Sequence, residues 1–506
     1  MLCKLETATV VGIEAIPVEV EVDASQGLPG FHMVGLPNGA VREGAVRIRA
    51  AVVNSGFDWS PAKITVNLAP ADVRKDGAAF DLPIAVGVLV CRGKLALKRS
   101  DLLLAGELSM DGRVKPIRGA LSLATAARRL GLTGIVLPAD NAAEAALVEG
   151  IEVYAVRTLR QAVNLLAGVE ELHATPRDLA LSAVEPEPAG VDLAEVRGQP
   201  EARRAAEVAA AGGHNLMLVG PPGAGKTMIA RRLGTIMPPP AMEEAIETTM
   251  VHSVAGLLGQ RAVLRQRPFR APHHTCSAAG MVGGGTNPRP GEVSLAHNGV
   301  LFLDELPEFQ RGVLEALRQP LEDGQVTIVR VRQAVTFPAR FMLVAAMNPC
   351  PCGYWGSRER TCTCGLREAR RYLARVSGPL LDRFDLFVQV AAVRTGDLLA
   401  QGESERSADV AARVARARER QQRRFARARI HCNAQMSARQ VARHVPLEPS
   451  TRELLARYAD AHGLSARALH RCCKVARTLA DLQEQDAVDE EHLLLALTLQ
   501  QARWER

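Results

Sequence analysis

The 506-residue sequence lacks any uninterrupted apolar run long enough to span a membrane. Its longest apolar stretch, residues 82–91, is too short for a span and is predicted to be a core element. The N-terminal region carries Glu6 and Glu14 and lacks the layout of a signal peptide. We therefore expect a cytoplasmic protein without a membrane partner.

Aromatic residues are also scarce, at 4% of the chain, which argues against base stacking as a main binding device. Neither sign of charge dominates, and the net charge of +7 permits an anionic partner without establishing one. Apolar residues make up 47%, enough for large cores, and the length favours about three domains. Because disulfides are rare in the cytosol, the ten cysteines are expected to be thiols or metal ligands.

The clearest motif is a glycine-rich loop that fits the G-x-x-x-x-G-K-[ST] phosphate-binding pattern. It consists of Gly220, Pro221, Pro222, Gly223, Ala224, Gly225, Lys226 and Thr227. Strand-like residues 215–219 precede it and helix-like residues 228–233 follow, which disfavours the alternative of an ordinary glycine-rich turn. The glycines let backbone N–H groups face phosphates. Lys226 is expected to reach the β- and γ-phosphates of ATP, and Thr227 to bind Mg²⁺.

A second nucleotide signature is the apolar run at residues 299–303 followed by Asp304 and Glu305. The run predicts a strand buried on both faces of a parallel sheet, and ligands bind at the carboxyl ends of such strands. We expect Asp304 to hold Mg²⁺ through water and Glu305 to polarise the attacking water. A surface pair of acids is the alternative.

Two further polar residues extend this predicted site. The strand-like residues 341–347 end at Asn348, whose amide could orient the attacking water. Residues 379–385 include Arg383, which could reach the γ-phosphate bound by a neighbouring subunit and neutralise charge in the transition state.

Four cysteines form two C-x-C pairs, namely Cys350, Cys352, Cys362 and Cys364. Four thiolates suit tetrahedral Zn²⁺, although the spacing is tighter than the usual C-x₂-C pair. Free thiols and redox sensing are the alternatives. Because the cluster begins just after Asn348, a zinc-stapled loop could brace that residue or present nearby arginines to DNA.

Residues 250–290 and 325–337 interleave arginines with other residues, among them Arg261, Arg265, Arg267, Arg270, Arg330 and Arg332. We expect them to follow a DNA backbone without reading sequence, with solvated loop charges as the alternative. Residues 401–440 contain ten arginines and four acids and predict a helix with a basic face. We expect this face to be solvated, and contact with DNA or a neighbouring subunit is the alternative. His273 and His274 are expected to lie in a packed or hydrogen-bonded loop rather than a metal site.

The N-terminal third predicts a mixed α/β domain. Two of its passages, residues 64–81 and 112–121, resemble the proteolytic domain of the Lon family, in which a lysine activates a serine. The positions that match this dyad are Ala79 and Leu121. The resemblance therefore implies the fold, of ribosomal S5 type, and argues against peptidase activity.

The nucleotide motifs together resemble an AAA+ ATPase of the magnesium-chelatase-like branch. Residues 267–299 give a more specific resemblance. Together with the Lon-like N-terminal domain, they resemble the ComM/YifB family. The resemblance implies Asn348 as the first sensor, Arg383 as a finger acting in trans, and Arg467 as the second sensor in a helical lid, with Arg471 as its competitor. It also implies a hexameric ring that acts on DNA as a branch-migration helicase during recombination and natural transformation.

The expected architecture is α/β throughout its first two domains, with a parallel-sheet ATPase core and a helical C-terminal lid. The predicted segments are a Lon-like domain at 1–168, a linker at 169–191, the ATPase core at 192–395 and the lid at 396–506.

Three rival functions share parts of this pattern. A magnesium-chelatase subunit that drives metal insertion would share the ATPase core, but the fused Lon-like domain and the four cysteines count against it. An ATP-binding regulatory scaffold would not need Glu305 or Arg383. An ATP-dependent protease would need the missing dyad.

Overall fold

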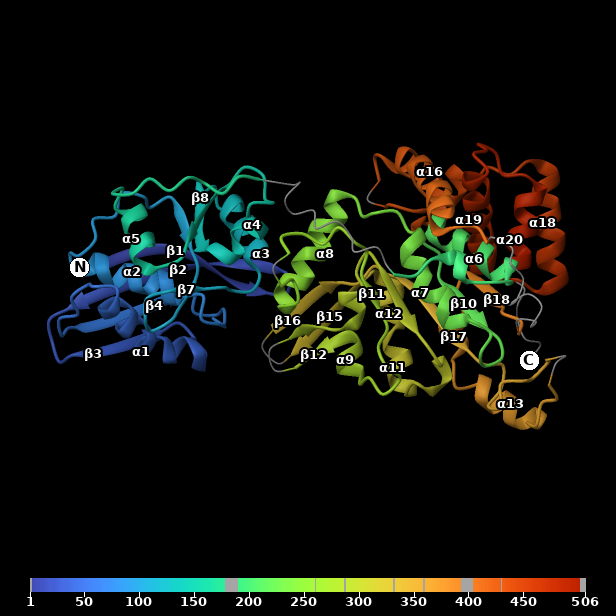
Figure 1. The fold of residues 1–506 in the computed structure, drawn as a ribbon, viewed down its shortest axis with the longest axis horizontal. Coiled ribbons are helices and arrows are strands. Elements are labelled where there is room, and N and C mark those ends of the chain that lie inside the picture. Colours follow the sequence, from blue (N-terminus) through green and yellow to red (C-terminus); the bar gives the residue numbers. More distant parts are fainter. Residues whose placement is uncertain are drawn as a thin grey trace. The chain divides into compact units, whose positions relative to one another are not determined.

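The computed structural model describes residues 2–177, 190–259, 261–285, 288–330, 333–357, 360–392, 404–428 and 430–500 (Figure 1). The chain divides into two compact units. Unit 1 consists of Met1–Glu185, Met242–Arg265 and Val329–Phe337, and unit 2 of Pro186–Ala241, Gln266–Ile328 and Pro338–Arg506. Unit 1 thus includes two segments from the region predicted as ATPase core. Much of the predicted linker, and the predicted boundary at 395, lie outside the described residues.

Unit 1 is built on a seven-stranded mixed sheet of order β3-β4-β2-β1-β5-β8-β9. Its strands are β1 (Leu2–Val11), β2 (Glu14–Ser25), β3 (Gly30–Val34), β4 (Lys63–Ala69), β5 (Leu102–Leu104), β8 (Gly134–Pro138) and β9 (Glu152–Val156). Strand β2 pairs antiparallel with β1 and β4, whereas β5, β8 and β9 run parallel. Alternate β2 residues Val18, Val20 and Val22 are fully buried, as expected for a strand with one face on the core.

The helices of unit 1 cover this sheet, and a short β6–β7 hairpin (Glu107–Leu108, Val114–Lys115) adjoins it. They are α1 (Gly39–Asn54), α2 (Asp81–Cys91), α3 (Ala120–Arg129), α4 (Ala139–Ala145) and α5 (Leu159–Leu166). Helix α2 is apolar around its whole circumference, as expected for a helix that is buried against β1, β2 and α1. The prediction of a core element at residues 82–91 is confirmed.

Helix α8 (Met242–Ala255) joins the core of unit 1 and packs against α3. Ala245 and, just beyond the helix, Val263 are buried in the same hydrophobic cluster as Leu121 and Leu123. The Ser253 hydroxyl accepts a 3.0 Å hydrogen bond from the backbone N–H of Gly119. The sequence predicts that residues 250–290 contact DNA. The start of this segment instead helps to fill the core of unit 1.

Unit 2 contains a five-stranded parallel sheet of order β11-β14-β17-β10-β18. The strands are β11 (Phe269–Arg270), β14 (Val300–Leu303), β17 (Met342–Met347), β10 (Leu216–Val219) and β18 (Leu386–Gln389). The residues of β10, β14 and β17 are buried along their whole length, as both faces of the sheet are covered. Helices α6 (Pro200–Gly212) and α7 (Lys226–Ile236) pack on it.

Shorter elements connect these strands. They are η1 (Leu193–Glu195), α9 (Ala278–Val282), α10 (Glu292–Leu295), η2 (Leu306–Glu308), α11 (Arg311–Ala316), α12 (Arg318–Asp323), α13 (Leu366–Leu373) and α14 (Gly378–Leu381). Two hairpins stand apart from the main sheets, β12–β13 (Gly283–Gly284, Arg289–Pro290) and β15–β16 (Gln325–Arg330, Gln333–Pro338). The second confirms the predicted pair of strands, and its tip, Val331 and Arg332, lies outside the described residues.

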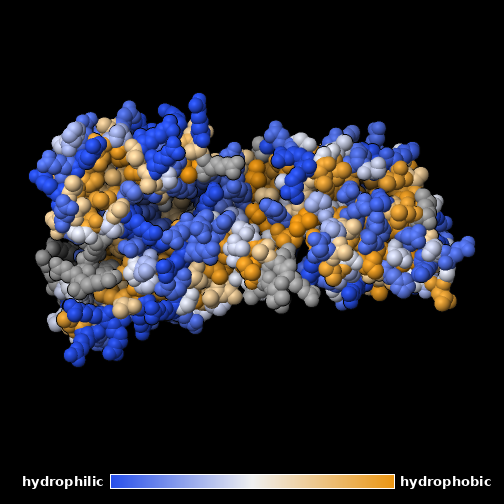
Figure 2. All heavy atoms as spheres, turned by 180° about the vertical axis from the view of Figure 1, so that it is seen from behind, coloured by the Kyte–Doolittle hydropathy of each residue, from blue (hydrophilic) through white to orange (hydrophobic). Residues whose placement is uncertain are grey.

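The predicted C-terminal lid is helical, drawn orange to red in Figure 1. It comprises α16 (Ser407–Phe425), η3 (Asn433–Gln435), α17 (Ala438–His444), α18 (Pro449–His462), α19 (Ala466–Leu482) and α20 (Glu490–Gln500). No helix among the described residues is both long and apolar enough to cross a membrane. Figure 2 shows hydrophilic and hydrophobic residues interspersed over the face that it draws.

Candidate nucleotide-binding and metal sites

Three parallel strands of unit 2 end at the predicted nucleotide site. The register pairs Val219 of β10 with Met347 of β17, and Leu303 of β14 with Ala345 of β17. The next residues along the chain are the loop 220–227, Asn348 and Asp304. Because the strands are parallel, these three features meet at one edge of the sheet.

The loop has the backbone that its glycines predict. Gly223 and Gly225 have φ angles of 78° and 90°, in the left-handed region that other residues rarely adopt. At Gly220, an added Cβ atom would lie 2.0 Å from the carbonyl oxygen of Val390, so a larger residue would force the strand end apart. Helix α7 begins at Lys226, which directs the N–H groups of its first turn towards the loop.

Lys226 is buried at the centre of the loop. Its ammonium group donates hydrogen bonds to the carbonyl oxygens of Gly220 at 2.7 Å and Pro221 at 2.9 Å, and to Oδ1 of Asn348 at 3.1 Å. Burial lowers the pKa of Lys226, and the nearby charges of Asp304 and Glu305 oppose that effect. A partly desolvated cation beside a cradle of N–H groups is an arrangement that a phosphate would stabilise.

The predicted magnesium ligands lie side by side. The Thr227 hydroxyl donates a 2.7 Å hydrogen bond to Oδ2 of Asp304. The other carboxylate oxygen of Asp304 accepts the backbone N–H of Glu305 at 3.0 Å. Hydroxyl and carboxylate oxygens are ligands that Mg²⁺ prefers, so the donor set fits this ion.

Glu305 has two unusual features. Its φ angle of 51° is left-handed, which is uncommon for a residue with a side chain. Its carboxylate lies 3.6 Å from Nδ1 of His274, a residue whose proximity the sequence did not indicate. The His273 ring lies tilted against that of His274, and its Nδ1 contacts the Thr275 hydroxyl at 2.9 Å, which confirms the prediction of a packed or hydrogen-bonded loop.

The arginines predicted to sense or complete the site lie together at another place. Arg383 forms an ion pair with Glu322 of α12, and Arg467 lies 3.7 Å from the same carboxylate. Arg471 donates to the carbonyl oxygen of Phe384 at 3.0 Å. Among the described residues, no hydrogen bond or ion pair joins Arg383 or Arg467 to the loop 220–227.

Two arginines predicted to contact DNA have internal partners instead. Arg267 donates to the carbonyl oxygens of Pro238 at 2.8 Å and Asn298 at 2.7 Å. Arg270 forms a two-pronged ion pair with Glu292, at 2.7 and 2.8 Å. Both guanidinium groups are thus engaged by other residues of unit 2.

The predicted basic helix, α16, is also engaged within unit 2. Arg413 pairs with Glu207 and Glu405, Arg416 with Glu484, Arg420 with Asp486, Arg424 with Asp481, and Arg418 donates to the carbonyl oxygen of Ala210. The prediction of a solvated basic face is wrong for Arg418, which is buried, whereas Arg416 is 55% exposed and agrees with it. Composition reveals the charges of a helix but not the acids that face them.

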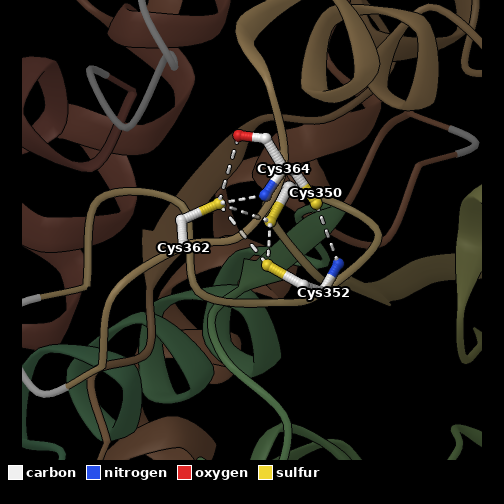
Figure 3. A group of neighbouring side chains, drawn as sticks. All are labelled: Cys350, Cys352, Cys362 and Cys364. Atoms are coloured by element: carbon white, nitrogen blue, oxygen red, sulfur yellow. Dashed lines mark hydrogen bonds between the residues drawn. The ribbon is translucent and has the colours of Figure 1, made fainter.

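The four predicted cysteine ligands converge in one cluster (Figure 3). Cys350 Sγ lies 3.4 Å from Cys352 Sγ and 3.7 Å from Cys362 Sγ, and the latter two are 3.4 Å apart. All four sulfurs lie within 4.8 Å of one another. Sulfurs around a tetrahedral zinc, with bonds of about 2.3 Å, would lie about 3.8 Å apart, whereas disulfide sulfurs would be about 2.05 Å apart.

Backbone N–H groups point at the sulfurs, as they do around metal thiolates. Trp355 N–H donates to Cys350, Cys352 N–H to Cys364, and Cys364 N–H to Cys362. Desolvation opposes ionisation of Cys352, but N–H donors of Tyr354 and Thr363 lower the pKa of its thiol to about 5. Among the described residues, this is the one group of three or more clustered side chains that could hold a metal.

The cysteine cluster adjoins the nucleotide site on two sides. Asn348, the partner of Lys226, stands just before Pro349 and Cys350. Gly353, with φ of 86°, packs so closely on the loop that an added Cβ would lie 2.5 Å from Cδ of Pro222. The sequence indicated the first contact but not the second.

In unit 1, no Ser–Lys dyad is present at the positions that match the Lon family. Leu121 is fully buried, and its backbone N–H donates to Glu144 at 3.1 Å. The nearby Ser122 hydroxyl donates to the carbonyl oxygen of Ile13 at 2.6 Å.

Comparison with known proteins agrees with this arrangement. Residues 192–398 match the family model described as magnesium chelatase, subunit ChlI, residues 20–141 match subunit ChlI of Mg-chelatase, and residues 404–500 match its C-terminal model. The competence protein ComM of Haemophilus influenzae is 44% identical over 490 residues, covering 96% of this chain and 95% of that protein. YifB of Escherichia coli K12 is 44% identical over 499 residues, covering 98% and 96%.

Lon protease 2 of Bacillus subtilis is 26% identical over 165 residues, 29% of each chain, in keeping with the Lon-like N-terminal domain. The nearly full-length similarity to ComM and YifB is decisive for the family. The chain belongs to the ComM/YifB family of magnesium-chelatase-like AAA+ proteins, with a Lon-like N-terminal domain, a parallel-sheet ATPase core and a helical C-terminal region.

Proposed function

We propose that this protein is an ATP-driven ring motor that moves branched DNA, extending heteroduplex during recombination or the uptake of DNA. The observation that carries the ATPase part is the convergence of Lys226, Thr227, Asp304 and Asn348 at the ends of three parallel strands. The DNA part rests on the resemblance to ComM, a competence protein by name.

In the proposed reaction, the N–H groups of loop 220–227 and the Lys226 ammonium bind the phosphates of ATP. Thr227 and Asp304 present adjacent oxygens for Mg²⁺, which neutralises phosphate charge when bound. Glu305 orients and polarises the attacking water. Asn348, which accepts a hydrogen bond from Lys226, would orient the same water from the side of β17.

Arg383 would complete the site of a neighbouring subunit. Its ion pair with Glu322 holds the guanidinium outside its own phosphate loop, as a finger acting in trans requires. Because Arg467 shares Glu322, we propose that the second sensor belongs to the same surface. Hydrolysis would then depend on assembly, and a closed ring, hexameric by family resemblance, satisfies every subunit.

The cysteine cluster would hold a structural Zn²⁺. Cys350, Cys352, Cys362 and Cys364 supply four sulfurs at separations close to those of a tetrahedral site, and the N–H donors stabilise thiolates. Zinc in such a closed site supplies no chemistry to the reaction and fixes the loop that follows β17.

DNA contact would be sequence-independent and made through phosphates. Since Arg267, Arg270 and much of α16 are paired internally, the β15–β16 hairpin is the better candidate for DNA contact. A pore hairpin would place its basic tip against a strand or duplex as neighbouring subunits hydrolyse ATP in turn.

A chelatase-type subunit is the second candidate, because three family models are described by magnesium chelatase. ATP hydrolysis by the purified protein, measured with and without four-way-junction DNA, separates the two. We expect several-fold stimulation by DNA that is lost in Lys226→Ala and Glu305→Gln. Turnover indifferent to every DNA, and dependent on a porphyrin, would instead support the chelatase.

A further inference from the structure

Glu305 has one ion-pair partner among the described residues, and that partner is His274. The carboxylate is 59% exposed and the imidazole 33%, so the pair sits at the surface of the site. An exposed glutamate samples several rotamers, and a water-activating carboxylate is effective only when it is held in one geometry. The partner that limits its motion therefore bears on catalysis.

The fold places His274 beside Glu305 for a topological reason. Strand β11 pairs parallel with β14, with Phe269 opposite Val300 and Arg270 opposite Leu301. The chain leaving β11 therefore reaches the same edge of the sheet as the chain leaving β14. His274 lies in the first segment and Glu305 in the second.

The imidazole of His274 is itself held on two sides. The His273 ring lies against it, tilted by 34° with centroids 4.0 Å apart, and the Phe309 ring meets it edge-on at 6.4 Å and 80°. Phe309 follows Glu305 after the short helix η2, so the same turn supports both members of the pair. A ring fixed in this way can restrain a neighbouring carboxylate, which a free surface histidine could not do.

The backbone of Glu305 is also constrained. A left-handed conformation is unfavourable for a residue with a side chain and persists only where surrounding contacts enforce it. Here the Glu305 N–H donates to Asp304 at 3.0 Å, and its carbonyl oxygen accepts from Glu308 N–H at 2.8 Å. The main chain of Glu305 is thus fixed locally, and the side-chain group that faces its carboxylate is the His274 imidazole, at 3.6 Å.

We propose that His274 is a positioning residue for Glu305, holding the carboxylate in the orientation that activates water. This inference rests on the proposed ATPase function. His274 touches neither phosphate nor magnesium in this scheme, so its loss acts on the rate of hydrolysis and not on the binding of ATP.

The test is steady-state ATP hydrolysis by the full-length chain with His274→Ala. We expect kcat to fall about tenfold, in line with the cost of misplacing a catalytic group, while KM for ATP stays within twofold. His274→Asn should recover part of the loss, because an amide N–H can also donate to the carboxylate. In a Glu305→Gln background, His274→Ala should cause no further loss, since the group that it orients is gone.

The matched control is His462→Ala in α18. His462 is an exposed histidine whose ring stacks on that of Tyr458 at 4.0 Å, and among the described residues none of its ring or hydrogen-bond contacts is with the nucleotide site. We expect wild-type kcat and KM. A wild-type kcat in His274→Ala, or equal losses in the wild-type and Glu305→Gln backgrounds, would overturn the inference. A wild-type protein that hydrolyses no ATP would overturn the proposed function first, and this inference with it.

Discussion

At the scale of single residues, the account depends on a division of labour between two carboxylates. Asp304 is tied to Thr227 and to the N–H of Glu305, which suits a metal ligand that must not move. Glu305 keeps its carboxylate free of such bonds and pairs only with His274 among the described residues. Adjacent residues thus acquire different environments, one fixed and one able to meet a water molecule.

The residue-scale prediction concerns Arg383, proposed to act on the neighbouring subunit. Arg383→Ala and Lys226→Ala should each hydrolyse ATP at less than about a tenth of the wild-type rate, because each removes charge stabilisation from the transition state. An equimolar mixture of the two variants should recover a measurable fraction of that rate. Some interfaces in mixed rings would join an intact loop to an intact arginine.

The control is a mixture of Arg383→Ala with wild-type protein at the same ratio, which reports simple dilution of active subunits. Activity in the mixture of variants no greater than the mean of the two alone would place Arg383 in its own subunit's site and contradict the proposal.

At the scale of elements, the loop after β17 links the cysteine cluster to the phosphate loop. Gly353 contacts Pro222 so closely that a side chain cannot be added without displacement. We expect Gly353→Ala to raise Kd for ATP about tenfold, because the phosphate loop must move to relieve the clash. Titration with a fluorescent ATP analogue measures the effect.

Gly356→Ala is the matched control for that substitution. Gly356 also has a positive φ, 74°, but an added Cβ would meet nothing within 4 Å. It shares the backbone strain of Gly353→Ala and lacks the clash, so ATP affinity should stay within twofold of wild type. Equal weakening by both variants would show that strain in the cysteine loop, and not its contact with Pro222, governs binding.

A second element-scale feature joins the ATPase core to the lid. His214, fully buried after α6, contacts Thr478 of α19 at 2.8 Å and lies 3.6 Å from Asp385. Asp385 also accepts the N–H of Asn215 at 3.0 Å. Burial opposes ionisation of Asp385, but hydrogen bonding and charge attraction from His214 and the Asn215 N–H hold its pKa below the ordinary value.

A depressed carboxylate pKa contributes stability above the unfolded-state pKa, about 3.9, and that contribution is lost as pH falls through the folded value. Asp385→Asn should therefore lower the free energy of unfolding by about 1–3 kcal/mol at neutral pH. The difference in Tm from wild type should narrow below about pH 4. Asp460→Asn, on an exposed face of α18, should match wild type throughout. A difference that widens on acidification would contradict the assignment.

At the scale of the whole molecule, the N-terminal fold is completed by residues from the middle of the chain. Helix α8 packs on α3, and Ser253 serves both the Gly119 N–H and the buried carboxylate of Glu144. Burial raises the pKa of Glu144, which makes a lost hydrogen bond there costly. The segment Met242–Arg265 belongs to unit 1, and the chain that precedes and follows it belongs to unit 2.

Ser253→Ala should lower the stability of the full chain by about 1–3 kcal/mol, because two buried groups lose a partner. Thermal unfolding of the whole protein measures this, and Ser60→Ala, whose hydroxyl bonds to the exposed Asp58, is the control with no expected change. An unchanged Tm for Ser253→Ala would contradict the role of α8 in the N-terminal core.

Local patterns explain why part of the site could be predicted from the sequence. The phosphate loop, the acids after β14 and the amide after β17 each follow a strand, so neighbouring residues suffice to identify them. The contacts of His274 with Glu305 and of Gly353 with Pro222 depend on how strands order in the sheet, which no local pattern reveals. The fold class could be predicted from the order of the motifs. The packing of α8 in unit 1 could not, because its partner α3 lies far away in sequence.

The central claim is that ATP hydrolysis moves branched DNA. The most direct measurement is conversion of a labelled four-way junction with homologous arms into duplex products by the purified full-length protein. We predict ATP-dependent conversion that is abolished by Lys226→Ala and by Glu305→Gln, since both remove hydrolysis while leaving the fold intact. An active ATPase that leaves the junction unresolved at every protein concentration, or conversion that proceeds equally with Glu305→Gln, would contradict the account.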